Sequence, residues 1–410
     1  MTDSELLPHL FRTEYRKIVA VLTGLFGIEN IAIAEDVASE TFLMASETWG
    51  LKGLPPNPAA WLYRVAKNKA IDQLRRNKLF NDKISKTLLR SGSPDEPEVD
   101  LSAQNISDSQ LQMMFAVCHP SIPREAQIGL ALNILCGFGV DEIADAFLSN
   151  RETIYKRLAR AKEKLRTEKI KMELPVPEEI NKRLETVLTT LYLLFNEGYY
   201  SSSQNTKLRK DLCMEAMRLT LMLTENPLTN IPEANALLSL MCFHASRFEA
   251  RINANGEIVL YEDQDDTLWD KELIEKGKLY LETAFANGNK VGRFHMEAAI
   301  ALWHTNKTDS PEKWETILQF YNRLLQIEYS PVAALNRTYA LAKANGKQQA
   351  IIEAEKLKLD DNHLYHSLLA ELYSNINNDR SLQHLQRALS LAKSESDKLF
   401  ISKKIEKLTL

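Results

Sequence analysis

Glycine and proline are scarce in this chain, with 14 of each among 410 residues. Long stretches that alternate apolar and polar residues are also missing, which argues against a turn-rich β protein. Leu, Ala, Glu and Lys, which favour helices, dominate instead. The sequence therefore predicts an all-α fold, and its length allows two to four domains.

Cysteine is rare as well. The four cysteines are scattered and form no CxxC pair, which disfavours a zinc site or a disulfide scaffold. The N-terminus lacks a basic region followed by an apolar run, so no signal peptide is predicted. No stretch approaches about 18 uninterrupted apolar residues, so no membrane span is predicted. We expect a cytoplasmic protein with buried, reduced thiols and no membrane partner.

No charge of one sign dominates, because the net charge is −4. Binding to nucleic acid would therefore depend on local basic patches. No paired acid and base, nucleophile or metal-ligand set stands out in the sequence. The sequence predicts a protein that is not an enzyme, with no catalytic residues, cofactor or metal site.

Residues 61–78, WLYRVAKNKAIDQLRRNK, predict a helix with two different faces. An apolar seam recurs at helical spacing, formed by Leu62, Ala66, Ala70 and Leu74. The candidate contacts on the other side are Trp61, Arg64, Lys67, Asn68, Arg75 and Arg76. Cations meet phosphates and an aromatic ring stacks on an unpaired base, so this face suits single-stranded DNA. From spacing alone, a solvated basic helix with a half-buried Trp explains the pattern equally well.

Residues 34–49, AEDVASETFLMASETW, predict a helix with an acidic outer surface. Val37, Phe42 and Ala45 can face inward, whereas the acidic residues outside are Glu35, Asp36, Glu40 and Glu47. By itself, such a surface is ordinarily a solvated helix face.

Residues 107–172 have the layout of a helix-turn-helix domain. They follow residues 80–106, which lose periodicity and predict a flexible linker. Ser149 and Glu152 have capping-box spacing, which places a helix start there. The outer residues of that helix are Arg151, Thr153, Lys156, Arg157 and Arg160. A basic helix in this position enters the major groove of DNA, although a basic surface helix in an ordinary helical domain is the alternative.

The chain continues for more than half its length beyond LPVPEE, which marks a boundary near residue 173. In LYLLFNEGYYSSS, Asn196, Glu197 and Gly198 fit a helix cap, whereas Asn196, Glu197 and Tyr199 would alternatively form a regulatory contact. From about residue 294, Leu335 recurs as Leu369 and Tyr339 as Tyr373. This 34-residue period is typical of tetratricopeptide helix pairs, which present a groove to a protein or peptide.

Several of these segments resemble extracytoplasmic-function sigma factors, the small members of the bacterial sigma-70 family. WLYRVAKNKAIDQLRR closely resembles their promoter-melting and −10-reading helix. Residues 34–49 resemble the helix that docks on the coiled coil of the polymerase β′ subunit, and residues 107–172 resemble the −35-reading domain. NEGYY, DLCMEAMRL, VLYEDQDDTLWD and SPVAALNRTYALA resemble a subgroup in which a long C-terminal extension governs sigma activity.

The resemblance implies a role for each candidate residue. Asp36, Glu40 and Phe42 would bind core polymerase, the face with Trp61 would capture the opened −10 strand, and the helix with Arg157 would read −35 DNA. Ser39 and Leu148 depart from the pattern, standing where Gln and Gly are common. The implied partners are core RNA polymerase, through its β′ and β subunits, promoter DNA, and a protein or peptide that binds the extension.

The implied domain organisation has five parts. They are sigma region 2 (1–79), a flexible linker (80–106), a sigma region 4 helix-turn-helix (107–172), a helical extension with the NEGYY motif (173–290) and tetratricopeptide-like repeats (291–410). A helix-turn-helix regulator with a tetratricopeptide sensor, which does not dock on polymerase, is the alternative. That alternative leaves the first domain without a role.

Overall fold

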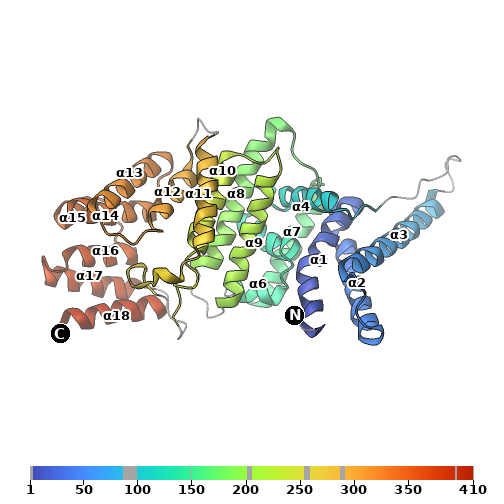
Figure 1. The fold of residues 1–410 in the computed structure, drawn as a ribbon, viewed down its shortest axis with the longest axis horizontal. Helices are drawn as coiled ribbons and strands as arrows, with labels where there is room; N and C mark the ends of the chain where they lie inside the picture. The colour runs from blue at the N-terminus through green and yellow to red at the C-terminus, as the bar shows by residue number, and fades with distance from the viewer. Residues whose placement is uncertain are drawn as a thin grey trace. The chain divides into compact units, whose positions relative to one another are not determined.

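The computed structural model describes residues 3–85, 99–147, 149–200, 206–253, 259–286, 291–392 and 395–409. Within these ranges the chain forms helices α1–α18, short 3-10 and π segments, and no strand, which confirms the all-α prediction (Figure 1). The chain divides into two compact units. Unit 1 comprises Met1–Tyr199 and Lys207–Thr229, and unit 2 comprises Tyr200–Thr206 and Asn230–Leu410.

Unit 1 begins with three helices that pack in sequence order: α1 (Asp3–Phe26), α2 (Ile31–Lys52) and α3 (Pro58–Ser85). Their shared core contains most of the apolar seam predicted for α3: Leu62, Ala66 and Ala70 are fully buried, and Leu74 is half-buried. Gly53 ends α2 with φ 80°, a value that favours glycine, and its N–H donates to the Trp49 carbonyl. The basic face of α3 is thereby fixed on a packed scaffold.

The segment predicted to form a helix-turn-helix follows in the same unit. It consists of α4 (Ala103–Val117), α5 (Arg124–Leu130), a π-helical turn (Ala131–Leu135), α6 (Val140–Ala146) and α7 (Arg151–Thr167). The predicted linker is shorter than expected, because α3 continues to Ser85 and α4 begins at Ala103. The cap of α7 is Asn150 rather than Ser149, since the Asn150 side chain accepts the Thr153 N–H at 2.7 Å. Leu148 lies outside the described residues.

Most of two helices of the predicted extension also belongs to unit 1, namely α8 (Pro177–Tyr200) and α9 (Thr206–Glu225). The proline-marked position near residue 173 therefore does not separate compact units. The predicted cap at Asn196–Gly198 is also wrong, because α8 continues through these residues to Tyr200.

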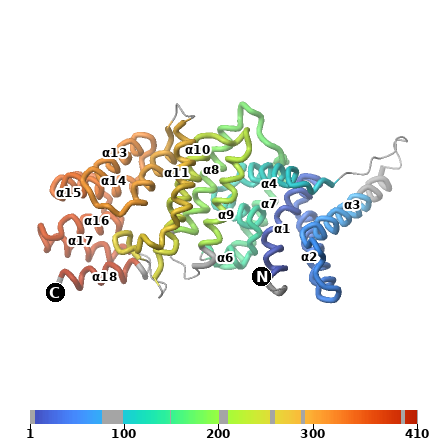
Figure 2. The backbone as a smooth tube through the Cα atoms, viewed as in Figure 1, coloured from blue at the N-terminus to red at the C-terminus, as the bar shows by residue number. Residues whose placement is uncertain are grey.

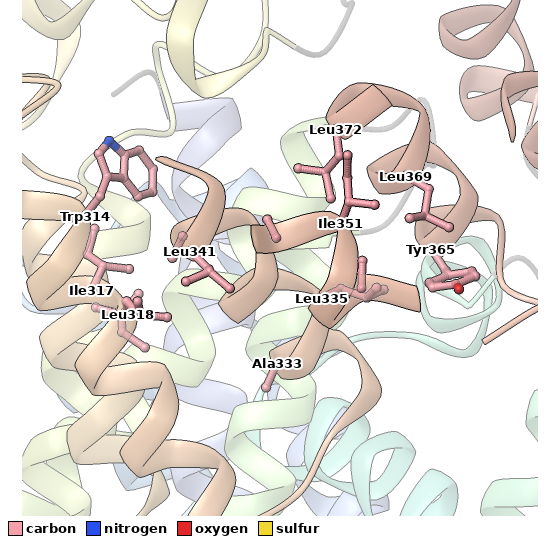
Figure 3. Packing of buried hydrophobic residues seen from close by; sticks show 14 of the residues in the cluster. Trp314, Ile317, Leu318, Ala333, Leu335, Leu341, Ile351, Tyr365, Leu369 and Leu372 are labelled. Carbon is pink, nitrogen blue, oxygen red and sulfur yellow. The ribbon is translucent and has the colours of Figure 1, made fainter. Parts of the chain in front are cut away.

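Unit 2 contains α10 (Pro232–Ala245), α11 (Lys271–Ala286) and α12 (Arg293–Trp303), followed by six further helices traced in Figure 2. These are α13 (Pro311–Ile327), α14 (Pro331–Asn345), α15 (Lys347–Glu355), α16 (His363–Tyr373), α17 (Asn378–Leu391) and α18 (Glu395–Thr409). Each packs on the next, and Leu335, Ile351 and Leu369 meet in one apolar cluster (Figure 3). Leu335 and Leu369, which stand 34 residues apart, are both buried, whereas Tyr339 is half-buried and Tyr373 is buried.

Across the described ranges, no helix combines the length and the apolar character needed to cross a membrane.

Candidate polymerase- and DNA-binding surfaces

The outer side of α2 carries a stripe formed by Asp36, Glu40, Leu43 and Glu47, which we call the α2 stripe. Its members stand at i, i+4, i+7 and i+11, so they share one helix face, and all are exposed. Leu43 is 60% exposed, although it is a large apolar residue. An apolar side chain between carboxylates suits a protein partner with basic and apolar residues. Sequence reasoning missed Leu43, although its spacing from Asp36 would have placed it on this face.

Phe42 does not belong to this exposed surface. It is 5% exposed, and its ring meets that of Phe11 edge to face at 5.1 Å between centroids. The role assigned to Phe42 as a direct polymerase contact is therefore corrected: it is a core residue that fixes α2 against α1. Ser39 is exposed, and its Oγ lies 3.3 Å from the Tyr15 hydroxyl oxygen.

The DNA-binding candidates on α3 lie next to the α2 stripe. Arg64, Asn68, Arg75 and Arg76 are exposed, whereas Trp61 and Lys67 are half-buried. The Trp61 ring packs edge to face on Trp49, with 5.4 Å between centroids. Lys69 Nζ donates to Glu40 Oε2 at 2.7 Å, so an ion pair joins α3 to the α2 stripe.

The candidate −35 helix, α7, is built as its periodicity predicts. Ile154, Leu158, Ala161 and Leu165 are buried. The candidate contacts Arg151, Thr153, Lys156 and Arg160 are exposed, and Arg157 is half-buried. Exposed ion pairs hold two of the cations, Arg151 to Asp141 at 3.4 Å and Lys156 to Glu152 at 2.6 Å. Such pairs contribute little to stability, so the cations can exchange them for phosphates.

The candidate regulatory residues on α8 divide into two kinds. Asn196 and Glu197 are half-buried, whereas Tyr199 is 6% exposed and its ring stacks on Phe195 at 5.7 Å between centroids. A side chain packed in this way cannot face a partner, so the assignment of Tyr199 as a contact residue is corrected to a core residue.

A polar cluster that sequence reasoning missed lies between α1, α9 and the π-helical turn that precedes α6. We call Arg16, Glu215 and Arg218 the polar hub. Arg16 Nη1 lies 2.5 Å from Glu215 Oε2, and Arg218 Nε donates to the same oxygen at 2.8 Å. Arg218 Nη2 also donates to the Leu135 carbonyl at 3.0 Å. The hub therefore joins α1, the extension and the domain that carries α7.

Further polar contacts reinforce this arrangement. Arg183 Nη2 on α8 donates to the Phe115 carbonyl at 2.7 Å. Thr190 Oγ1 donates to Gln127 Oε1 at 2.9 Å. Lys162 Nζ on α7 lies 2.6 Å from Glu35 Oε1 on α2. These pairs are distant in sequence and share no local pattern, so no signal in one sequence identifies them.

Comparison with known proteins finds family models that match two parts of the chain. The family model for sigma-70 region 2 matches residues 10–80, which cover α2 and the Trp61 face. The match supports a sigma-70 family factor, with a role in transcription initiation that implies binding to core RNA polymerase and promoter DNA. A second model, a family of unknown function (DUF6596), matches residues 183–285.

The chain belongs to the same family as uncharacterized protein R00370 of Rhizobium meliloti (strain 1021). The two are 33% identical over 387 residues, which cover 92% of this chain and 90% of that protein. No solved structure matches the chain at a comparable level.

Proposed function

We propose that this chain is a bacterial sigma factor that directs core RNA polymerase to specific promoters and aids DNA melting, with a C-terminal extension that regulates it. The observation that carries the proposal is the pairing of two surfaces within the segment that matches sigma-70 region 2. The α2 stripe suits a protein, the adjacent Trp61 face suits single-stranded DNA, and the Glu40–Lys69 ion pair joins them. The segment predicted to form a helix-turn-helix lies in the same unit and would read duplex DNA.

In this proposal each surface performs one step. The α2 stripe docks on the β′ subunit. The Trp61 face receives the −10 strand as the duplex opens, because a ring can stack on a base only after that base leaves the helix. The exposed side of α7 enters the major groove at −35. Polymerisation belongs to the polymerase, so the chain needs no catalytic group.

The regulatory role of the extension rests on the polar hub and its neighbouring contacts. Sites at −10 and −35 are about 25 base pairs apart, or roughly 85 Å at about 3.4 Å per pair. Helix α3, which packs on α2, and helix α7 cannot reach both sites while Lys162 on α7 stays bonded to Glu35 on α2. We propose that α8 and α9 keep the Trp61 face and α7 close together. We also propose that the tetratricopeptide-like repeats of unit 2 bind a protein or peptide, and that this binding weakens or strengthens the contacts of α8 and α9.

Alanine at both Asp36 and Glu40 is expected to weaken binding to core polymerase about 10- to 100-fold, because the two exposed carboxylates are lost from the proposed interface. Binding would be measured by fluorescence anisotropy with labelled chain. The matched control is Glu178→Ala with Glu179→Ala, which makes the same charge change at exposed positions on α8. Unchanged polymerase binding, with gene regulation intact, would favour the helix-turn-helix regulator instead.

Arg157→Ala is expected to weaken binding to the −35 element by about 1–3 kcal/mol, provided that its guanidinium reads a guanine through two hydrogen bonds. Holoenzyme binding would be compared on templates with every base substituted in turn at the −35 element. The loss should be confined to one position. A uniform loss over all templates would make Arg157 a phosphate contact.

A further inference from the structure

The outer surface of α7 has two flanks of different chemistry. The buried residues Ile154, Leu158, Ala161 and Leu165 fix the inner side of the helix. On one flank stand the cations Lys156, Arg157, Arg160 and Lys164, spaced at helical intervals. Tyr155 and, one turn later, Ala159 lie on the opposite flank, on the other side of Ile154 from these cations. Tyr155 and Ala159 are thus the exposed uncharged residues of a second flank that also carries Arg151, Lys162 and Arg166.

Tyr155 is unusual for its exposure. It is 64% exposed and is the one large apolar side chain of α7 that is not buried or half-buried. Among the described residues, no hydrogen bond or ring contact of its side chain is found. Its ring therefore contributes little to the fold, and it stands on the second turn of the helix, in the half that contacts base edges when such a helix lies in the major groove.

The cations nearest to Tyr155 are already engaged in the free protein. Arg151 pairs with Asp141, and Lys156 pairs with Glu152 one turn earlier. Phosphates can replace these carboxylates, but that exchange carries no base information. Tyr155 needs no such exchange, and a ring with two side-chain torsions loses little conformational entropy on binding. Tyr155 is therefore an exposed side chain at this end of α7 that can meet a base without first releasing a partner.

The chemistry of the major groove specifies which base this flank selects. Adenine, guanine and cytosine present polar edges there, whereas thymine presents its 5-methyl group. The Tyr155 ring and the exposed Ala159 methyl group stand one turn apart, and both can make apolar contact with a thymine methyl group. We propose that Tyr155, together with Ala159, reads a thymine methyl group in the −35 element. This inference rests on the proposed function, because it requires α7 to bind promoter DNA.

The test uses holoenzyme assembled from full-length chain and core polymerase. Bound duplexes are first enriched from a pool randomised over the −35 region, and each enriched thymine is then replaced singly by uracil, which lacks only the methyl group. We expect one thymine at which uracil lowers affinity about fourfold, the effect of one buried methyl-sized group. With Tyr155→Ala, thymine and uracil templates should bind equally. With Tyr155→Phe, the fourfold difference should remain.

Tyr329→Ala removes an equally exposed tyrosine (63%) from unit 2 and should leave the fourfold difference intact. A difference that persists in Tyr155→Ala would overturn the assignment. If Tyr155→Ala lowered affinity equally for the thymine and uracil templates, the assignment would also be overturned, because the ring would then be a DNA-backbone or protein contact. Failure to enrich any sequence would overturn the proposed function as well, so the two failures are distinguishable.

Discussion

Glu215→Ala is expected to destabilise unit 1 by about 3 kcal/mol, the lower end of the effect of removing one partner from a buried ion pair. The Arg16 side chain is only 8% exposed, and its Nε has no hydrogen-bond partner among the described residues. Glu215 is therefore the group that compensates the burial of the Arg16 charge. Hydrogen exchange of the amides in α1 and α9 would measure the loss, because these helices meet at the hub.

The neighbouring pair provides the control. Arg12 and Asp211 join the same two helices at 3.6 Å, but both side chains are substantially exposed. Asp211→Ala should therefore cost less than about 1 kcal/mol. The combined change Arg16→Met and Glu215→Leu should restore most of the stability, because apolar residues can replace a buried pair at little cost. Equal effects of Glu215→Ala and Asp211→Ala would contradict the account of the hub.

Trp61→Ala is expected to lower affinity for a single-stranded −10 oligonucleotide by about 5- to 150-fold, which corresponds to the roughly 1–3 kcal/mol of base–aromatic stacking. Affinity for duplex −35 DNA should not change, since the ring has no access to a paired base. Fluorescence anisotropy of holoenzyme on the two labelled DNAs would measure both values.

The test of Trp61 needs a control for stability, because Trp61 is half-buried and packs on Trp49. Part of any loss could therefore come from damage to the core of the first three helices. Trp49→Phe serves as the matched control, since it disturbs the same ring contact from the buried side. If Trp49→Phe and Trp61→Ala reduced single-strand binding equally, stacking by Trp61 would be excluded.

Helical periodicity predicted the local structure of this chain well. Three of the four seam residues of α3 and the inner residues of α7 are buried as expected, and the all-α fold is confirmed. Periodicity also indicated that Phe42 can face inward, and its burial shows that the spacing was a better guide than the motif. The predicted cap of α7, Ser149, lies one residue before the observed cap, Asn150. Both residue types are good caps, and only the backbone geometry selects between them.

Helical periodicity could not predict the contacts that join the parts of unit 1. The Arg16–Glu215 pair spans nearly 200 residues, and neither side chain belongs to a motif. A charged residue on an amphipathic helix is normally predicted to face solvent, so the local sequence does not indicate that Arg16 is buried. For the same reason, the boundary inferred from LPVPEE did not reveal that α8 and α9 pack with the helices before it.

Run-off transcription with purified core polymerase tests the central claim most directly. The template would carry the promoter of the operon that encodes this chain, and the chain would be used at full length. The proposed function predicts a discrete transcript that requires both the chain and the polymerase and is lost when Asp36 and Glu40 are both replaced by alanine. Absence of any transcript, with binding of the chain to duplex DNA intact, would contradict it.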